Sequence, residues 1–291
     1  MTDERGPIGL VGLGLMGEVL AGRLMAAGFA VLGYDIDPAK NAKLELAGGR
    51  AADALVDVAQ CRTVVLAVFS TEQVEQVVEQ ALVPAACPEK VVLCTSTCDP
   101  DRIAELAARV APKGIRFLET PVSGTSEQVR RGDGVGLIGG DPQIATEAAA
   151  ILDALFPRRC HIGKAGEGGR AKLAVNLILG LNRLALAEGL VFATKMGLDP
   201  KAFIEVARSS AAYSQVMDTK ARKMIERDFA PEGRVRQTLK DVNMMLDQAE
   251  RLGQQLPALE NNANMLEACV RAGEADYDNS AVIEEIRRRH I

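Results

Sequence analysis

Lys172 and Asn176 are the residues of this sequence whose types and spacing most directly suggest proton-transfer chemistry. They lie four positions apart, so in an α-helix the ammonium and the carboxamide share one face. An ammonium group can donate a proton to a forming alkoxide, and a neutral amine can take one from a hydroxyl. The usual pKa of lysine, about 10.4, is too high for a base at neutral pH, so burial or a nearby cation must lower it. Histidine occurs only at positions 161 and 290, which leaves lysine as the available candidate.

A glycine pattern near the amino terminus indicates a dinucleotide. Gly12, Gly14 and Gly17 fit G-x-G-x-x-G, after an apolar strand pattern and at the start of a helical one. The first glycine permits a tight turn, the second lets the backbone approach a pyrophosphate, and the third lets helix and strand pack closely. The helix amino terminus then faces the anion with N–H groups that have no helical partner. A glycine-rich turn without a ligand is the alternative that this context disfavours.

Asp35 bears on the choice of dinucleotide. It follows the second strand pattern, 23 residues after Gly12, close to the separation of about 20 residues expected for the acid that binds the ribose. A carboxylate there accepts hydrogen bonds from both ribose hydroxyls and repels a 2′-phosphate, and Ile36 and Asp37 supply no arginine for that phosphate. We therefore expect NAD rather than NADP. A carboxylate that only caps the turn before Pro38 would be compatible with either cofactor.

Two different patterns organise the elements that must position these residues. In the first half, short apolar runs alternate with helical segments, which predicts βαβ units in an α/β Rossmann domain with a doubly wound, mainly parallel sheet. The second half predicts one long helix over 166–196 and an all-α domain beyond it. The composition changes near 164, so we expect a Rossmann domain over 1–164 and a helical domain over 165–291. The expected strands are 7–12, 30–35, 63–69, 90–95, 115–119 and 134–139, and the later helices are 200–208, 214–227, 235–252, 257–272 and 280–289.

Composition excludes several classes of protein. The net charge is −5, with 34 Lys and Arg against 39 Asp and Glu, whereas nucleic-acid binders usually carry a basic excess. No apolar stretch long enough to span a membrane lacks a charge, so no membrane partner is expected. The acidic, polar start predicts no secretory signal. Six scattered cysteines without a C-x-x-C pair predict reduced thiols in a cytoplasmic protein and no metal site.

Motifs spread over the whole chain resemble those of the β-hydroxyacid dehydrogenase family, which includes 3-hydroxyisobutyrate dehydrogenase and tartronate semialdehyde reductase and is related to 6-phosphogluconate dehydrogenase. The resemblance implies a Rossmann domain, a long interdomain helix and an all-helical domain, in agreement with the elements inferred above. The motifs are, in order, Gly12-Leu13-Gly14-Leu15-Met16-Gly17, Ser96-Thr97-Cys98-Asp99-Pro100, Thr120-Pro121-Val122-Ser123-Gly124, the segment 166–176 with Lys172 and Asn176, and Lys240-Asp241.

The resemblance also implies roles for individual residues. The resemblance implies that Lys172 is the general acid/base. The helix pattern alone would instead suggest a lysine whose side chain reaches solvent. Asn176 holds the reacting oxygen or the adjacent carbon chain. Ser123 and Gly124 anchor the substrate carboxylate, and Thr125 adds a hydroxyl where the family often has a second glycine. Phe69 ends a strand, where it either packs on the nicotinamide or is a plain core residue. The expected cofactor contacts are Gly12, Gly14, Leu15, Met16, Gly17, Asp35, Phe69, Thr97 and Lys240.

Three hypotheses about function follow. The first is an oxidoreductase that transfers a hydride between NAD and a short β-hydroxy acid or its semialdehyde, and that forms a homodimer or homotetramer through exposed apolar surface on the long helix. The second is an imine reductase-like NAD(P)H enzyme, against which Lys172 argues because those relatives generally lack the lysine. The third is a non-catalytic dinucleotide-binding module. Measuring the turnover of hydroxy acids by the wild type and by a Lys172 variant distinguishes these three hypotheses.

Overall fold

The computed structural model describes residues 6–289 of the 291-residue chain, which divides into two compact units. The first unit ends at Lys172 and the second begins at Leu173. The sequence predicted a boundary between residues 164 and 165, and the division of the units falls later, inside the long helix. Residues 1–5, on which the absence of a secretory signal was predicted, and His290 lie outside the described residues.

A mixed but mainly parallel sheet forms the centre of the first unit, with nine strands in the part of the chain described. The strand order is β3-β2-β1-β4-β5-β6-β8-β7, with β9 beside β8. The run from β3 to β6 is parallel, whereas β8 is antiparallel to both β6 and β7. The strands are β1 (Ile8–Val11), β2 (Val31–Tyr34), β3 (Arg50–Ala51), β4 (Thr63–Leu66), β5 (Lys90–Cys94), β6 (Ile115–Glu119), β7 (Val122–Ser123), β8 (Val135–Gly139) and β9 (Arg158–Gly163).

The register places the carboxyl ends of the parallel strands at one level. Val11 pairs with Tyr34 on one side and Leu66 on the other, Leu66 pairs with Cys94, and Cys94 pairs with Glu119. The chain winds outward from β1 in one direction and from β4 in the other, so the topological switch point lies between these two strands. Open parallel sheets bind ligands at the carboxyl edge beside such a point. The confirmed doubly wound fold therefore predicts the edge at which the site lies.

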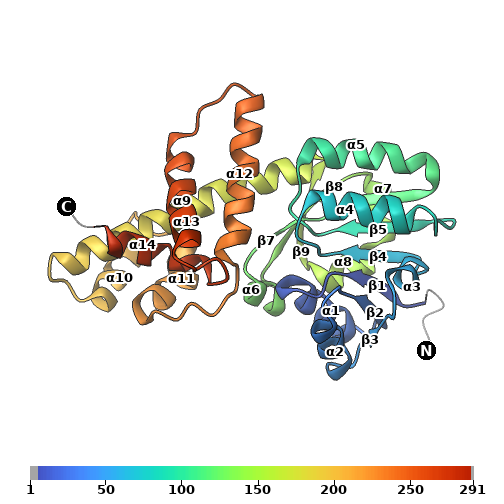
Figure 1. Ribbon diagram of the computed structural model, residues 1–291, viewed down its shortest axis with the longest axis horizontal. Coiled ribbons are helices and arrows are strands. Elements are labelled where there is room, and N and C mark those ends of the chain that lie inside the picture. The colour runs from blue at the N-terminus through green and yellow to red at the C-terminus, as the bar shows by residue number, and fades with distance from the viewer. Residues whose placement is uncertain (1–5, 290–291) are drawn as a thin grey trace. The chain divides into compact units, whose positions relative to one another are not determined.

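Helices cover both faces of this sheet (Figure 1). Buried side chains of α1, α6, α7 and α8 pack against one face, in a core that includes Leu20 and Phe156. Side chains of α3, α4 and α5 form a second core on the opposite face, around Val64 and Leu106. The helices are α1 (Leu15–Ala26), α2 (Pro38–Leu46), α3 (Leu55–Ala59), α4 (Thr71–Val77) with a π-helical turn (Val78–Leu82), α5 (Pro100–Val110) with a 3-10 turn (Ala111–Lys113), α6 (Ser126–Arg131), α7 (Pro142–Glu147) and α8 (Ala149–Leu155).

All six strands predicted from apolar runs are present, while β3, β7 and β9 were missed. β3 and β7 have two residues each, too short for a pattern. β9 begins with Arg158 and Arg159 and is largely exposed, as expected for an edge strand with little apolar character. The continuous apolar run that identifies a buried parallel strand is therefore missing there.

The second unit is helical, as predicted, and the long helix α9 (Glu167–Lys195) runs into it from the first unit. Asp199 caps the next helix through a hydrogen bond of 2.8 Å from the Ala202 N–H, with Pro200 at the first helical position. Leu184, Ala187 and Leu190 of α9 lie in the core of this unit. The other helices are α10 (Pro200–Arg208), α11 (Gln215–Glu226), α12 (Val235–Arg251), α13 (Pro257–Arg271), a 3-10 turn (Asn279–Ala281) and α14 (Val282–Arg288).

By length and hydropathy alone, α9 is the one described helix that could cross a membrane, with a mean hydropathy of 1.5 over its most apolar window. The core helix of a soluble protein passes the same test. Arg183 and Glu188 lie in the middle of α9, between the side chains that it buries in the core. Part of its apolar surface therefore packs against the neighbouring helices, and 39% of the apolar window is buried.

Candidate active site

The glycine loop joins β1 to α1 and has the geometry that its sequence predicts. Gly12 has a φ of +91°, and a Cβ there would lie 2.5 Å from the Ala67 carbonyl oxygen. A Cβ at Gly17 would lie only 1.9 Å from the Gly12 oxygen, so helix and loop pack too closely for any side chain. A Cβ at Gly14, by contrast, would meet nothing within 4 Å. The backbone is therefore open to a ligand at the middle glycine and closed at the other two.

Helix α1 presents free backbone donors beside this opening. Gly14 is its N-cap and offers no side chain, and the first helical hydrogen bond runs from the Glu18 N–H to the Gly14 oxygen, over 2.9 Å. The N–H groups of Leu15, Met16 and Gly17 precede that bond and have no acceptor within the helix. Together with the positive end of the helix dipole, they suit a pyrophosphate. The loop thus fits the dinucleotide that the sequence predicts.

Asp35 lies one residue beyond β2 and is buried against this loop. Its carboxylate accepts hydrogen bonds from the Leu13 N–H, at 2.8 Å, and from the Asp37 N–H, at 2.9 Å. The Lys40 ammonium lies 3.2 Å away and pairs with the same carboxylate. Asn41 fixes the Asp35 backbone through two further hydrogen bonds. The carboxylate is held where the fold expects the ribose acid, with a cation beside it that the sequence analysis did not assign.

Two further predicted cofactor contacts follow β4 and β5 at the same sheet edge. Phe69 is 43% exposed, so it is not the core residue that was the alternative interpretation. Thr97 is half-buried, next to Ser96, whose hydroxyl donates a 2.8 Å hydrogen bond to the Val68 oxygen and ties the two strand ends together. Both side chains thus lie at the carboxyl edge, where ligands bind in open parallel sheets.

The predicted carboxylate anchor spans the end of β7 and the start of α6. Ser123 and Gly124 are half-buried, and Gly124 has a φ of +146°. Thr125 is the N-cap of α6: its hydroxyl accepts from the Gln128 N–H, at 3.2 Å, while Gln128 Oε1 accepts from the Thr125 N–H, at 2.9 Å. This capping box uses one lone pair of the Thr125 hydroxyl and leaves its proton for another acceptor.

The start of α9 is anchored by Glu119, a residue that the site prediction did not include. Its buried carboxylate accepts from the Gly168 N–H, at 2.8 Å, and from the Gly169 N–H, at 3.1 Å. Burial raises the pKa of the Glu119 carboxyl to about 7, although these N–H groups and the Arg170 charge act to lower it. Lys172 follows within the same helical turn and is 7% exposed. Glu119 therefore fixes the helix end from which Lys172 projects.

In the second unit, Asp241 joins Asn176 and Lys240. Asn176 Nδ2 donates a 3.2 Å hydrogen bond to Asp241 Oδ2, and the Lys240 ammonium lies 3.0 Å from Asp241 Oδ1. The second contact is an ion pair with poor hydrogen-bond angles, since Oδ1 accepts no hydrogen bond from the described residues. Asp241 is buried and was quoted in the sequence only as part of the Lys240-Asp241 motif. The pairing of these side chains cannot be deduced from their separation in the sequence.

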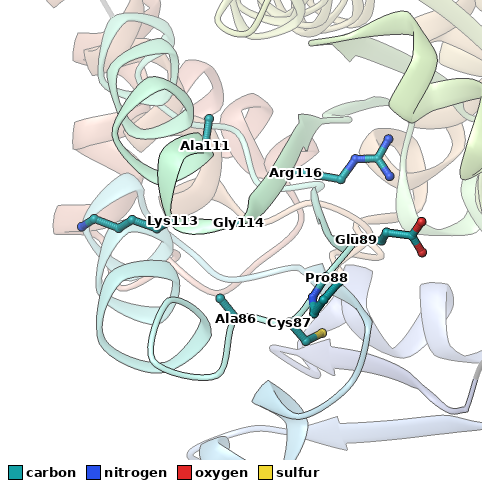
Figure 2. A pocket seen from close by; sticks show the side chains of 8 residues that line it. All are labelled: Ala86, Cys87, Pro88, Glu89, Ala111, Lys113, Gly114 and Arg116. Atoms are coloured by element: carbon teal, nitrogen blue, oxygen red, sulfur yellow. The ribbon is translucent and has the colours of Figure 1, made fainter.

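The remaining features lie away from this arrangement. A hollow with a volume of 310 Å³ is lined by residues that include Cys87, Lys113 and Arg116, at the amino ends of β5 and β6 (Figure 2). It is thus at the opposite edge of the sheet from the glycine loop. His161 on β9 contacts the Gly140 oxygen at 2.9 Å. Residues 6–289 contain no group of three or more His, Cys, Asp or Glu side chains placed to hold a metal ion.

Comparisons with known proteins show the family to which the chain belongs. Residues 7–163 match the family model described as the NAD binding domain of 6-phosphogluconate dehydrogenase. Residues 166–286 match a second model, described as NAD-binding of NADP-dependent 3-hydroxyisobutyrate dehydrogenase. The chain belongs to the β-hydroxyacid dehydrogenase family. The resemblance inferred from the sequence is thereby confirmed, and family membership supports NAD(P)-linked hydride transfer by an oxidoreductase.

Relatives of this family member align over nearly its whole length. L-threonate dehydrogenase from Cupriavidus necator is 30% identical over 281 residues, which cover 95% of each chain. 2-Hydroxy-3-oxopropionate reductase from Escherichia coli is 28% identical over 282 residues, or 96% of each chain. The crystal structure of 3-hydroxyisobutyrate dehydrogenase from Salmonella typhimurium has a TM-score of 0.87 and 27% identity, covering 96% of this chain and 99% of that one. These relatives differ in the substrates that their names give.

Proposed function

We propose that this β-hydroxyacid dehydrogenase transfers a hydride between NAD and a short β-hydroxy acid, or the corresponding semialdehyde, with Lys172 as general acid/base. The observation that carries the proposal is the buried position of Lys172 in the glycine-rich start of α9, one turn before Asn176 on the same helical face. Glu119 fixes that start, and Asp241 fixes the Asn176 amide. A lysine and an amide held in this way are suited to bind one reacting oxygen.

The proposed roles of the residues follow from their chemistry. When bound, NAD(P) supplies the hydride for reduction or accepts it in oxidation. The α1 N–H groups hold the pyrophosphate, and Asp35 accepts from the ribose hydroxyls. Lys172 takes the proton of the substrate hydroxyl in oxidation and returns it to the alkoxide in reduction. Asn176 orients that oxygen. The carboxylate is bound by Ser123, Gly124 and Thr125, and the nicotinamide end is contacted by Phe69, Thr97 and Lys240.

The preference for NAD over NADP is part of the proposal and rests on Asp35. Its buried carboxylate is oriented by the Leu13 and Asp37 N–H groups, and Ile36 supplies no positive charge. A 2′-phosphate beside this carboxylate would be repelled. Lys40 acts in the other direction, because its ammonium 3.2 Å away offsets part of the negative charge. We therefore expect a preference for NAD and not complete rejection of NADP.

The test is NADH formation by the purified protein on a panel of short 3-hydroxy acids, with NAD and NADP in parallel and Lys172→Ala beside wild type. Lys195→Ala is the matched control, since it removes an exposed lysine from the last turn of the same helix. Removal of a general acid/base costs about 10²–10⁴ in kcat. We expect that loss for Lys172→Ala, with cofactor affinity retained, and no loss for Lys195→Ala.

The other outcomes separate the alternatives. Turnover by Lys172→Ala equal to that of wild type would overturn the lysine mechanism. Cofactor binding without turnover of any hydroxy acid would favour the non-catalytic module, and reduction of cyclic imines under the same conditions would favour the imine reductase-like enzyme. Both results would also contradict the carboxylate anchor at residues 123–125.

We also expect a homodimer or homotetramer. Ile178 and Phe192 of α9 are well exposed, as are Met196 and Leu198 just beyond it. Apolar side chains gathered on one long helix usually mark an interface in a soluble protein. Size-exclusion chromatography with light scattering measures the molar mass of the protein in solution. The mass of a monomer would overturn this expectation.

A further inference from the structure

Arg183 of α9 is a buried cation that lacks a direct partner. It is 8% exposed, and it makes neither a hydrogen bond nor an ion pair with any residue that the structure describes. Burial lowers the pKa of its guanidinium to about 10, and the one opposing influence is the charge of Asp278. A buried guanidinium normally gains a carboxylate or several carbonyl acceptors, because removal of its hydration is otherwise uncompensated.

Asp278 cannot supply that partner, since its two oxygens are already in use. Lys220 Nζ donates to both of them at 2.9 Å. Oδ1 also accepts from the backbone and hydroxyl of Ser280, and Oδ2 accepts from the N–H groups of Glu232 and Gly233. A carboxylate has about four lone-pair positions, and these are exhausted. Lys220 offsets the charge of Asp278, so Asp278 does not serve as a contact partner for the Arg183 guanidinium.

A buried donor without an acceptor lies near Arg183. Asn262 of α13 is 1% exposed, and its Nδ2 has no acceptor among the described residues. The two donors meet over Gly180, in the middle of α9: a Cβ at that position would lie 3.2 Å from Asn262 Nδ2 and 3.8 Å from Arg183 Nη2. A side chain at position 180 would therefore crowd both donors.

We propose that Gly180, Arg183 and Asn262 form a binding site for a second carboxylate of the substrate. The inference rests on the proposed function, because Asn176, Gly180 and Arg183 are spaced by four and three residues and so share the face of α9 that carries Lys172. Gly180 lies about 6 Å along the helix from Asn176. The substrate class is thus a β-hydroxy acid with a distal carboxylate, or the semialdehyde of a dicarboxylic acid.

The chemistry of the donors favours a carboxylate over other anions. A guanidinium presents two parallel N–H groups that match the two oxygens of a carboxylate, and the Asn262 amide adds one further donor. One cation also balances one negative charge, whereas a phosphate ester would bring nearly two. An uncharged substrate end would leave Arg183 uncompensated.

The first experiment compares two substrates in the intact enzyme: a short 3-hydroxy monoacid and its analogue with a second, terminal carboxylate. Arg183→Met keeps the volume and removes the charge. We expect it to raise KM for the diacid about 10- to 100-fold, the usual cost of losing a charged hydrogen bond, with kcat and the monoacid KM nearly unchanged. Gly180→Ala should show the same selectivity, because its methyl group would lie 3.2 Å from Asn262 Nδ2 and hinder the approach of a carboxylate to the two donors. An equal effect of Arg183→Met on both substrates would overturn the proposal.

A binding measurement separates this inference from the proposed function. Glutarate, which has no hydroxyl to oxidise, should raise the melting temperature of the wild type but not that of Arg183→Met or Gly180→Ala. If glutarate stabilises only the wild type but no hydroxy acid is turned over, the proposed function is wrong and the carboxylate site is supported. If monoacids are turned over but glutarate changes the melting temperature of all three proteins equally, or of none, only the carboxylate site is wrong. A shift with inorganic phosphate and none with glutarate would overturn the carboxylate assignment.

A structural role for Arg183 predicts a different result. If Arg183 served to hold Asp278 in place, Arg183→Met would lower the melting temperature of the unliganded protein and impair both substrates. The proposed site predicts an equal or higher melting temperature, because an uncompensated buried charge has been removed. Asn262→Leu provides an independent variant, with the same expected loss of the glutarate effect.

Discussion

Asp241 determines the orientation of the Asn176 amide. A carboxylate is an acceptor only, so the 3.2 Å contact from Asn176 to Asp241 Oδ2 must use the amide nitrogen and not the amide oxygen. Lys240, 3.0 Å from the other carboxylate oxygen, holds Asp241 in turn. These contacts give the Asn176 amide, which we propose binds the substrate, a fixed orientation before a ligand arrives.

Asp241→Asn should therefore lower kcat by about 10- to 100-fold, the usual effect of removing a group that orients a site residue. The new amide can offer either nitrogen or oxygen to Asn176, so the orientation is no longer imposed. Steady-state kinetics measure the loss, with thermal unfolding to show that the protein stays folded. Asp247→Asn, an exposed position on the same helix, is the control. A kcat equal to wild type would show that Asp241 only links the two helices.

The glycine loop predicts opposite results for two alanine variants. Gly17→Ala should prevent stable folding, because its Cβ would lie 1.9 Å from the Gly12 oxygen. Gly14→Ala should fold normally, since nothing lies within 4 Å, but should bind NAD at least tenfold more weakly because the methyl group meets the pyrophosphate. Fluorescence titration with NADH and thermal unfolding measure both effects. Gly22→Ala, on the exposed side of α1, should leave both properties intact, and tight NADH binding by Gly14→Ala would contradict the loop assignment.

Asp35 and Lys40 predict a change of cofactor preference. Asp35→Asn keeps an acceptor for the Leu13 N–H but removes the negative charge, so Lys40 becomes available to a 2′-phosphate. We expect the ratio of kcat/KM for NADP to that for NAD to rise about tenfold or more, which corresponds to about 1.4 kcal/mol. Lys40→Ala is the matched comparison and should lower this ratio. An equal ratio in wild type, Asp35→Asn and Lys40→Ala would show that Asp35 does not determine the cofactor preference.

Glu119 predicts a pH dependence of stability. Its pKa is raised from 4.5 to about 7 in the folded protein, so the folded state binds a proton more tightly than the unfolded state. The stabilisation is fully present below pH 4.5 and is lost as the pH rises to 7, by about 3 kcal/mol in total. Glu119→Gln keeps an acceptor for the start of α9 and cannot titrate. Its stability relative to wild type should therefore increase between pH 5 and pH 7.5.

Urea unfolding of the two proteins at both pH values measures this difference. Glu105→Gln, at an exposed position on α5, is the control and should follow wild type. A constant difference between Glu119→Gln and wild type would show that Glu119 does not titrate in this range. Cys94, which faces Glu119 from β5, stays protonated throughout, because the neighbouring Cys98 thiol and burial raise its pKa well above the usual value.

Much of the fold could be predicted from the sequence because it rests on local patterns. Buried parallel strands are continuous apolar runs, and the helices after 199 begin and end within about two residues of the prediction, at caps such as Asp199-Pro200. β9 could not be predicted, because it lies at the edge of the sheet, where exposed polar residues such as Arg159 are tolerated and no apolar pattern is required. The pairing of β9 with β8 is a property of the folded sheet alone.

The candidate site divides in the same way. The glycine loop, Asp35 and the Lys172–Asn176 pair are recognisable because their chemistry depends on spacing along the chain. Asp241 beside Asn176 is a contact across 65 residues, and no spacing rule predicts such a contact. Asn262 over Gly180 is a contact of the same kind. The signal that the sequence offers for the latter is Arg183, a charged residue among the apolar residues in the middle of α9.

Helix α9 crosses the division between the two units at residues 172 and 173, so Lys172 belongs to one unit and Asn176 to the other. The separation of this pair is nevertheless set inside a single turn of helix, by main-chain hydrogen bonds between residues four apart. Lys172 and Asn176 thus lie on one continuous helix, whose dimensions are the same in every α-helix. A mutation that loosened side-chain packing elsewhere in either unit would leave the spacing of this pair intact.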